Sequence, residues 1–276
     1  MKRIKPKKIQ NLGTHIILCT LLFLLLYPLA MAVWGAFKNA NEFAKTQWYP
    51  TLPLDFSSFI SVFKKLSPAI LNTVFIACVG AAGVLFLSSI TAYAFARMKF
   101  PGKEFFYMLI LGLLMIPSIL TLVPSFMLYK KLLGTDNYWI MIVPLWVGSP
   151  VGGVFLMRSF IEGIPESVFE AARLDGAGEF KLYTKMCLPL SVPIMGTMTI
   201  NLFTSVWNDY MWPMITIKDE SLLTVSAMLF LKYNNNAGSY PAMYAGYLVT
   251  ALPLIVLFIL MTKHYVEGLS SSAIKM

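Results

Sequence analysis

Six long apolar runs organise this sequence. Each holds about 20 residues or more, the length that an α-helix needs to cross the hydrocarbon core of a membrane. Gly and Pro within the runs are compatible with membrane helices, because neighbouring helices satisfy the freed backbone groups. The predicted spans are residues 14–37, 68–96, 105–129, 138–157, 191–215 and 243–262. We therefore expect an all-α membrane protein with six transmembrane helices.

The first run decides how the chain divides into domains. Ala30-Met31-Ala32 looks like a signal-peptidase site, but the apolar run continues past it to Phe37. A signal core has only about 7 to 15 apolar residues, so we expect an uncleaved first span. A basic N-terminal segment, residues 1–13, then precedes a single transmembrane domain, residues 14–276.

Two segments beside the spans have an apolar face next to a pair of lysines. In residues 59–66 the pair is Lys64 and Lys65, and in residues 126–133 it is Lys130 and Lys131. Apolar side chains recur at helical spacing in both, a pattern typical of helices that lie at a membrane surface. We expect two such surface helices.

Composition and charge support the membrane assignment. Hydrophobic residues make up 58% of the chain and charged residues 13%, whereas a soluble domain carries about 25% charged residues. The net charge of +9 would suit nucleic acid, but its distribution indicates membrane orientation instead. With a cytoplasmic N-terminus, 14 of the 22 Lys and Arg residues lie in the segments predicted inside. This bias predicts that both termini are cytoplasmic and that nucleic acid is not a partner.

The longest predicted inside loop, residues 158–190, is also the most charged part of the chain. Pro165 suits the first position of a helix, and Glu166 suits its first turn. Gly176 can end that helix, and a second short helix is predicted from Glu179 until Pro189 begins the fifth span. The sequence therefore predicts a compact helix–turn–helix knob in the cytoplasm.

The spacing within this loop is distinctive. Glu170-Ala171-Ala172 is followed, after three intervening residues, by Gly176. Nine residues then separate Gly176 from Met186, and one residue separates Met186 from Leu188-Pro189. This resembles the "EAA" loop of ABC importer permeases. The family usually has Ile where Met186 stands, a change of similar volume that should cost little.

Further motifs resemble one subfamily, the second permease subunit of maltose-type, binding-protein-dependent sugar importers. They cover most of the chain from the second span onward. The motifs are Ala92-Tyr93-Ala94-Phe95-Ala96-Arg97, Phe100-Pro101-Gly102-Lys103, Met115-Ile116-Pro117, Trp207-Asn208-Asp209 and Gly268-Leu269-Ser270 to Lys275. In the last of these motifs, Ser272 stands where the family often has Gly.

The resemblance implies a subunit of the bacterial or archaeal cytoplasmic membrane that works by alternating access. Its expected partners are membrane lipid, a second similar permease, two cytoplasmic ATPase subunits, an extracellular sugar-binding protein and a carbohydrate substrate. The helix of the EAA loop would dock in a cleft of an ATPase subunit and transmit its closure to the spans. The alternative is an amphipathic loop on the membrane surface. The residues expected to couple to the ATPase are Glu170, Ala171, Ala172, Asp175, Gly176, Leu188 and Pro189.

The fifth predicted span carries a polar stripe. Thr197, Asn201, Thr204 and Asn208 follow one another at helical spacing, and Asp209 is the only carboxylate inside any predicted span. Polar side chains with flanking aromatics suit sugars, which present hydroxyls and apolar ring faces. Asn201, Thr204, Asn208 and Asp209 are therefore substrate-pathway candidates. The alternative is that these groups hold helices together, and Asp209 lies far enough out to reach water.

The predicted outside loop, residues 218–241, is polar and turn-prone. By the family resemblance it meets the extracellular binding protein; the alternative is a disordered connector. The docking candidates are Tyr233, Asn234, Asn235, Asn236 and Gly238.

Several functions are not supported by any motif. The chain contains no phosphate-binding G-x-x-x-x-G-K-[S/T] loop, so ATP hydrolysis is expected on a partner and the chain is not expected to be an enzyme. His15 and His264 lack further ligands at useful spacing, so no metal or cofactor is expected. An ion-coupled secondary transporter remains the alternative function, although it predicts ionisable residues at the bilayer midplane. A membrane-embedded hydrolase lacks a nucleophile and base.

Overall fold

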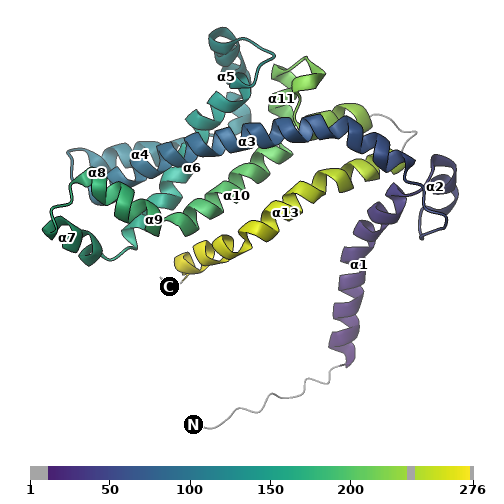
Figure 1. Ribbon diagram of the computed structural model, residues 1–276, viewed down its shortest axis with the longest axis horizontal. Helices are drawn as coiled ribbons and strands as arrows, with labels where there is room; N and C mark the ends of the chain where they lie inside the picture. Colours follow the sequence, from purple (N-terminus) through teal and green to yellow (C-terminus); the bar gives the residue numbers. More distant parts are fainter. Residues whose placement is uncertain (1–11, 235–239, 274–276) are drawn as a thin grey trace. The chain divides into compact units, whose positions relative to one another are not determined.

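The computed structural model describes residues 12–234 and 240–273, with side chains in residues 13–233 and 240–262 (Figure 1). Every regular element in these ranges is helical. The long helices are α1 (Leu12–Ala36), α3 (Ser57–Arg97), α6 (Trp139–Glu162), α10 (Val192–Asn208) and α13 (Tyr240–Ala273). The shorter ones are α2 (Ala40–Thr46), α4 (Lys103–Leu113), α5 (Ser118–Leu133), α7 (Glu166–Leu174), α8 (Glu179–Lys181), η1 (Leu182–Cys187), α9 (Leu188–Leu190), α11 (Met211–Thr216), η2 (Glu220–Leu222), α12 (Val225–Leu229) and η3 (Phe230–Asn234). The all-α membrane fold is confirmed.

Four helices of the described chain, α1, α3, α6 and α13, are long and apolar enough to cross a membrane alone. Two bent helix pairs raise the number of candidate spans to six when each pair counts as one. The first pair is α4 with α5, which meet at 95°, and the second joins residues 179–190 to α10 at 69°. Four of the six apolar runs therefore correspond to continuous helices, and the third corresponds to the broken pair of α4 and α5. The fifth corresponds to α10, which is bent against residues 179–190 and ends at Asn208, short of the predicted end at residue 215.

The third predicted span differs most from the structure. We expected one helix over residues 105–129, but the chain breaks between Leu113 and Ser118. Pro117 lacks an amide hydrogen and disfavours helical geometry at Ile116, which explains the break at this position. Hydrophobic periodicity alone does not register such a bend.

The two predicted surface helices are not separate elements. Residues 59–66 form the first turns of α3, and residues 126–133 form the last turns of α5. Both segments have the expected helical conformation, but each continues directly from an apolar helix. The 41-residue length of α3 results from this continuation.

The chain forms two compact units, which we describe separately. In the larger one (residues 64–235 and 250–276), small residues let α3 approach α6. A Cβ atom at Gly83 would lie 2.1 Å from Nε1 of Trp146, and one at Gly153 would lie 2.2 Å from Oγ of Ser88. Small residues are enriched where membrane helices pack, because packing drives their association.

The smaller unit (residues 1–63 and 236–249) contains α1, α2 and the adjoining ends of α3 and α13. Phe43 of α2 is buried, and its ring centroid lies 5.6 Å from those of both Tyr240 and Tyr244. Offset or tilted aromatic pairs at this separation are favourable. This aromatic contact holds α2 against the start of α13.

Candidate functional site

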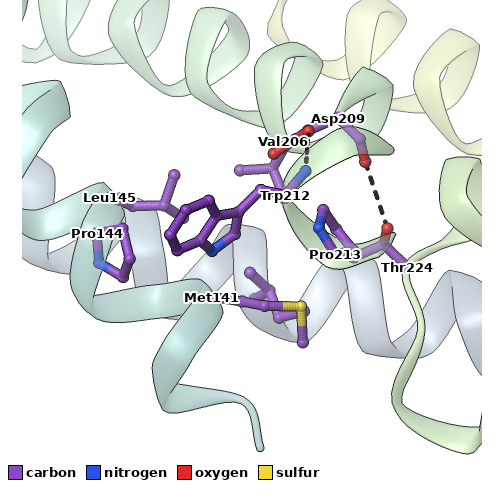
Figure 2. A pocket seen from close by; sticks show the side chains of 9 residues that line it. Met141, Pro144, Leu145, Val206, Asp209, Trp212, Pro213 and Thr224 are labelled. Carbon is purple, nitrogen blue, oxygen red and sulfur yellow. Dashed lines mark hydrogen bonds between the residues drawn. The ribbon is translucent and has the colours of Figure 1, made fainter. Parts of the chain in front are cut away.

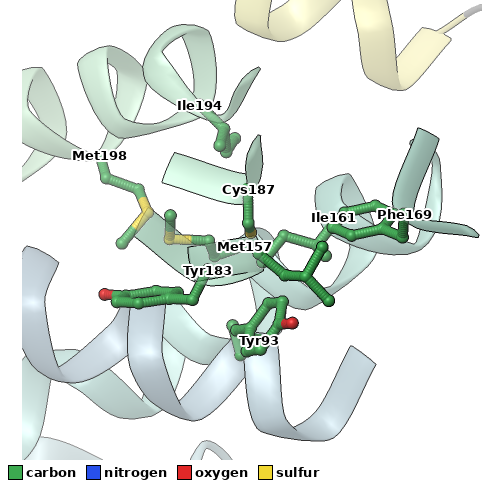
Figure 3. Close-up of a cluster of buried hydrophobic side chains, with 10 residues drawn as sticks. Tyr93, Met157, Ile161, Phe169, Tyr183, Cys187, Ile194 and Met198 are labelled. Atoms are coloured by element: carbon green, nitrogen blue, oxygen red, sulfur yellow. The ribbon is translucent and has the colours of Figure 1, made fainter. Parts of the chain in front are cut away.

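The α7 knob, which we define as α7 with the turn at residues 175–178, has an apolar inner face and a polar outer face. Phe169 is 0% exposed and packs in a buried cluster with Ile161 and Tyr183 (Figure 3). Ala172, a predicted coupling residue, is half-buried and packs against this cluster. The other predicted coupling residues of the knob are exposed: Glu170, Ala171, Asp175 and Gly176. The helix thus anchors through one face and presents the other.

Gly176 ends α7 in the way expected from its position. Its φ is +78°, in the left-handed region that favours glycine. The amide of Gly176 donates to the carbonyl of Arg173 at 2.9 Å, and the amide of Ala177 donates to that of Ala172 at 3.0 Å. These two bonds make a Schellman motif, which satisfies the terminal carbonyls of the helix. The turn is therefore rigidly specified.

Two large apolar side chains are nearly fully exposed beside this turn. Leu174, the last residue of α7, is 90% exposed, and Phe180 of α8 is 80% exposed. Apolar side chains grouped at the end of an exposed helix are typical of a protein contact surface. The sequence did not predict this exposure, because Leu174 and Phe180 look like ordinary core residues of a short amphipathic helix.

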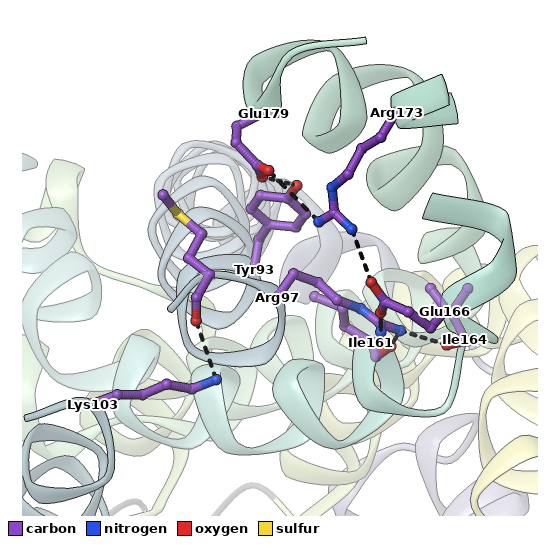
Figure 4. A network of polar contacts seen from close by, with 9 residues as sticks. Tyr93, Arg97, Lys103, Ile161, Ile164, Glu166, Arg173 and Glu179 are labelled. Atoms are coloured by element: carbon purple, nitrogen blue, oxygen red, sulfur yellow. Dashed lines mark hydrogen bonds and ion pairs between the residues drawn. The ribbon is translucent and has the colours of Figure 1, made fainter. Parts of the chain in front are cut away.

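Arg97, the last residue of α3, ties the knob to that helix. Its Nη2 donates to the carbonyls of Ile161, at 2.6 Å, and Ile164, and its Nη1 donates to a carboxylate oxygen of Glu166 (Figure 4). Its guanidinium also lies 4.3 Å from the ring centroid of Phe169, a cation–π contact. One side chain thus holds both the backbone that enters α7 and the buried face of α7.

A chain of polar contacts returns from the knob to α3. Nη1 of Arg173 donates to Glu166 at 2.9 Å, and its Nη2 lies 3.6 Å from Glu179. The hydroxyl of Tyr93, one turn before Arg97 on α3, donates to Glu179 at 2.6 Å (Figure 4). Arg97, Glu166, Arg173, Glu179 and Tyr93 therefore close a ring, which we call the polar ring.

Electrostatics keep the polar ring charged. Hydrogen bonding to Arg173, together with the nearby charge of Arg97, lowers the pKa of Glu166. In turn, the hydrogen bond to Glu166 raises the pKa of Arg173. Opposite charges this close favour the ionised form of each group. At neutral pH the knob is thus held by ionised partners.

In the sequence, Tyr93 and Arg97 stand within a family motif, and no role was predicted for either. Their spacing of four residues places them on one face of a helix, and this was the available signal. The partners come from residues 161–179, so only the folded chain reveals the ring. Among the described residues, no group of three or more His, Cys, Asp or Glu could hold a metal ion.

Leu188 and Pro189 do not share the exposed face of the knob. They lie in α9, beyond the π-helical turn η1. Leu188 is half-buried against the cluster around Phe169, and Pro189 is exposed at the start of the bend into α10. The structure therefore separates the predicted coupling residues into an exposed group on the knob and a pair at the entrance to α10.

The polar stripe of α10 lies mostly at the surface of this chain. Asn201, Thr204 and Asn208 are exposed, whereas Thr197 is buried. The amide of Asn208 donates to the carbonyl of Thr204 within the same helix at 2.9 Å. Within the described residues, none of the three exposed side chains bonds to another helix of this chain. No hydrogen bond in the described part of the chain therefore supports the alternative that these three side chains hold helices of this chain together.

Asp209 is separated from this stripe. It lies between α10 and α11 and lines a cavity of about 150 Å³ with residues that include Met141 and Trp212 (Figure 2). Its carboxylate accepts a hydrogen bond from the amide of Trp212 at 3.2 Å, which caps the first turn of α11. The side chain of Asp209 thus has a structural partner at the helix break.

The predicted outside loop is more ordered than its composition suggests. Residues 220–234 form η2, α12 and η3, and Tyr233 is only 8% exposed. Burial of Tyr233 leaves little of its ring available for a binding protein in this conformation. The side chain of Asn234 and all of Asn235, Asn236 and Gly238 lie outside the described residues.

Comparison with known proteins identifies the family. A family model described as "Binding-protein-dependent transport system inner membrane component" matches residues 84–270. The chain is 32% identical to the probable ABC transporter permease protein YurM of Bacillus subtilis, over 98% of this chain and 92% of that one. It is 30% identical to the arabinooligosaccharides transport system permease protein AraQ of Halalkalibacterium halodurans, over 92% of each chain.

A solved structure has the same fold. A chain from a bacterial ABC transporter involved in the import of the acidic polysaccharide alginate superimposes with a TM-score of 0.81, at 22% identity, over 96% of this chain and 99% of that one. The family model and the relatives confirm the resemblance inferred from the motifs. This chain therefore belongs to the family of binding-protein-dependent transport system inner membrane components.

Proposed function

We propose that this chain is one permease subunit of an ATP-driven importer that carries a sugar or oligosaccharide into the cytoplasm by alternating access. It would pair with a second permease, two ATPase subunits and an extracellular sugar-binding protein. Relatives named for arabinooligosaccharides and maltodextrin support the substrate class. The observation that carries the proposal is the exposed α7 knob, whose inner face is tied to the end of α3.

The knob would receive the motion of the ATPase. Glu170 offers a carboxylate to a basic partner, while Leu174 and Phe180 offer apolar surface that an ATPase cleft would cover. Packed interfaces move as units rather than deform continuously. A shift of α7 would therefore move α3 through the polar ring and Phe169, and α10 through η1.

The exposed polar stripe of α10 would line the substrate pathway. Asn201, Thr204 and Asn208 are exposed in this chain, so a second permease that faced them would enclose a polar passage. Hydroxyl and amide groups of this kind can exchange hydrogen bonds with a sugar. Asp209 would hold the outer end of the passage in shape through its cap on α11.

The segment between η3 and α13 would meet the extracellular binding protein. Tyr233 is buried near the end of η3, so little of its side chain would be available to the binding protein. Asn234, Asn235, Asn236 and Gly238 would supply the contacts. In this arrangement both termini and the α7 knob would lie in the cytoplasm of a bacterium or archaeon, as the lysine and arginine bias predicts.

Transport in a purified system tests the energy source. The four-subunit complex in proteoliposomes, with binding protein and labelled oligosaccharide outside, should accumulate substrate only with ATP inside. An ionophore that collapses ion gradients should leave uptake unchanged. Uptake that needs the gradient but not ATP would establish the alternative, an ion-coupled transporter.

Substitutions on the knob test coupling. Glu170→Lys and Leu174→Ser should each reduce co-purification of the ATPase and lower uptake at least tenfold, because one reverses a charge and the other removes apolar contact. Lys185→Glu is the matched control, since Lys185 is exposed in η1, outside the knob. Normal assembly and uptake in both knob variants would refute docking through this surface.

Substitutions on α10 test the pathway. Asn201→Leu and Asn208→Leu should each reduce uptake at least tenfold while the complex assembles normally, because the passage loses one amide group in each variant. Thr199→Val keeps the shape of a half-buried residue of the same helix and serves as the control. Wild-type uptake in both Asn variants would exclude the stripe from the pathway.

A further inference from the structure

A loop between α2 and α3 exposes a group of large apolar side chains. Residues 48–54, which we call the aromatic loop, contain no charged residue. Trp48 is 60% exposed and Leu52 is 83% exposed, and Tyr49 and Leu54 are exposed as well. Four large apolar side chains in a short loop are unfavourable in water. Some apolar or amphipathic surroundings must therefore cover the loop in the cell.

A buried lysine holds the aromatic loop in one conformation. Lys38 is 1% exposed, and its ammonium donates to the carbonyl of Tyr49 at 2.6 Å and to Oγ1 of Thr46 at 3.2 Å. At the far end of the loop, the amide of Asp55 donates to the carbonyl of Phe37 at 2.8 Å. Because both ends are bonded to the residues that follow α1, the exposed side chains are presented by a fixed scaffold.

Hydrogen bonds to α1 fix the level of the loop along that helix. The hydroxyl of Tyr27 donates to the carbonyl of Trp48 at 2.7 Å, and Nε1 of Trp34 donates to the carbonyl of Gln47 at 3.1 Å. The chain therefore folds back from the end of α1 by nine residues, or about 13 Å at 1.5 Å per residue. Tyr27 lies about 22 Å from the first residue of α1.

This level lies near the far surface of a membrane that α1 crosses. The hydrocarbon core is about 30 Å thick, so a helix that starts at one face at Leu12 reaches the other about 8 Å beyond Tyr27. Trp and Tyr are enriched at this depth, because their rings are apolar and their N–H and O–H groups remain hydrated. Pro50 and Pro53 also leave two fewer amide hydrogens to satisfy there.

We propose that the aromatic loop rests in the headgroup region of the bilayer, with Lys38 as the residue that positions it. The occupant of its exposed face is phospholipid. The absence of charge, the Trp–Tyr pair and the return to the level of Tyr27 together favour lipid over a protein partner. The loop would fix the depth of α1, a helix whose apolar window is 0% buried within this chain.

Fluorescence quenching tests the occupant. In a full complex whose Cys19, Cys78 and Cys187 are replaced by serine, Leu52→Cys and Lys45→Cys each carry one environment-sensitive fluorophore. Lys45 is exposed on α2 and serves as the matched control. The complex is placed in nanodiscs that contain phospholipid with a nitroxide near the headgroup, and aqueous iodide is the second quencher.

We expect the lipid nitroxide to quench the probe at residue 52 at least twofold more than the probe at residue 45, and iodide to show the reverse order. Iodide quenching at residue 52 equal to that at residue 45 would place the loop in water. Protection from both quenchers would place it against a protein subunit. Either result overturns the proposal.

A second variant tests the role of Lys38. Lys38→Met keeps an unbranched side chain that is one heavy atom shorter but removes the three donors, so the probe at residue 52 should lose at least half of its lipid quenching. Unchanged quenching would show that the loop holds its place without Lys38. Uptake is not needed for either measurement, so these results do not depend on the proposed substrate.

Discussion

Two buried arginines lie at or near the ends of long helices and are hydrogen-bonded in different ways. Arg97 ends α3 and Arg158 lies near the end of α6, and both are almost completely buried. Each guanidinium packs on an aromatic ring, that of Phe169 at 4.3 Å and that of Tyr107 at 3.7 Å. Within the described residues, each also leaves one nitrogen without a hydrogen-bond partner. The two sites thus have similar burial and a similar cation–π contact.

Their hydrogen-bond acceptors differ. Arg97 bonds two backbone carbonyls, those of Ile161 and Ile164, as well as Glu166. In the described part of the chain, the acceptors bonded to Arg158 are carboxylates, those of Glu162 at 2.7 Å and Glu104 at 3.2 Å. Carbonyls of a packed backbone cannot turn to water, whereas the side chain of Glu104 is 62% exposed and can. Arg97 therefore fixes the path of the chain into α7, and Arg158 holds α4 against α6 more loosely.

The largest effect is expected from Arg97→Met. It removes the donor to the carbonyl of Ile164 and a charge-assisted bond to Glu166, while the carbonyl of Ile161 keeps its bond from the amide of Ile164. The expected cost is about 3 kcal/mol in local stability. Hydrogen exchange should become at least tenfold faster in α7, and uptake should fall while the ATPase subunits remain active. Arg97→Lys should restore the function only in part, since an ammonium cannot bond three acceptors in one plane. Normal exchange in Arg97→Met would remove the basis of the comparison.

A smaller effect is expected from Arg158→Met. Glu104 and Glu162 can then turn to water, so the cost should be about 1 to 2 kcal/mol, mostly from packing on Tyr107. Exchange should increase in α4 and stay unchanged in α7. If Arg158→Met destabilises α7 as much as Arg97→Met does, the distinction between carbonyl and carboxylate acceptors has no consequence.

Gly176→Ala tests whether the contacts of Arg97 are enough to hold α7 in place when the turn at residue 176 is destabilised. An alanine in the left-handed region costs about 1 kcal/mol relative to glycine, and open space surrounds the position, so no clash adds to this. We expect a drop in the thermal stability of the knob, with ATPase co-purification weakened about fivefold. Gly178→Ala is the control, since its φ is −74°. Equal effects of the two substitutions would contradict a role for the turn.

The smallest effect is the response of the polar ring to acid. The pKa of Glu166 is lowered from its ordinary value of 4.5, so its ion pairs stabilise the fold above that value. This stabilisation is lost as the pH falls through the lower, folded-state pKa. Since Glu166 is about half exposed, the gain should stay below about 1 kcal/mol. A spin label at Ser167→Cys should become more mobile below pH 4, and Glu166→Gln should abolish that change. A pH response that persists in Glu166→Gln would place its origin elsewhere.

The sequence predicted the helix α7 more completely than the contacts that Arg97 and Arg158 make. Pro165 and Gly176 bracket α7 as expected, because proline and left-handed glycine act locally. In the sequence, Arg97 was visible as the last residue of a motif and Arg158 as a positive charge at the start of the predicted cytoplasmic loop. Their acceptors lie 54 to 69 residues away or on the following turn, and no local pattern specifies such pairs.

The same division holds for the pathway. Periodicity placed Asn201, Thr204 and Asn208 on one face of α10, and the structure exposes that face. Asp209 looked similar in sequence, but the break after α10 turns it towards the cavity beside Trp212. Because the backbone changes direction where α10 ends, the next side chain, that of Asp209, does not lie on the face where the helical period would place it.

By itself, the sequence determined the apolar runs, the helical knob between the fourth and fifth, and the family. These follow from hydrophobic periodicity, from the residues that begin and end helices, and from the long fixed spacing of a motif. Only the tertiary structure decided where two spans break, which side chains close the polar ring, and that Lys38 is buried beneath the aromatic loop. These depend on bonds between distant residues, because the cost of burying a charge is offset only by the particular carbonyls and carboxylates that folding brings to it.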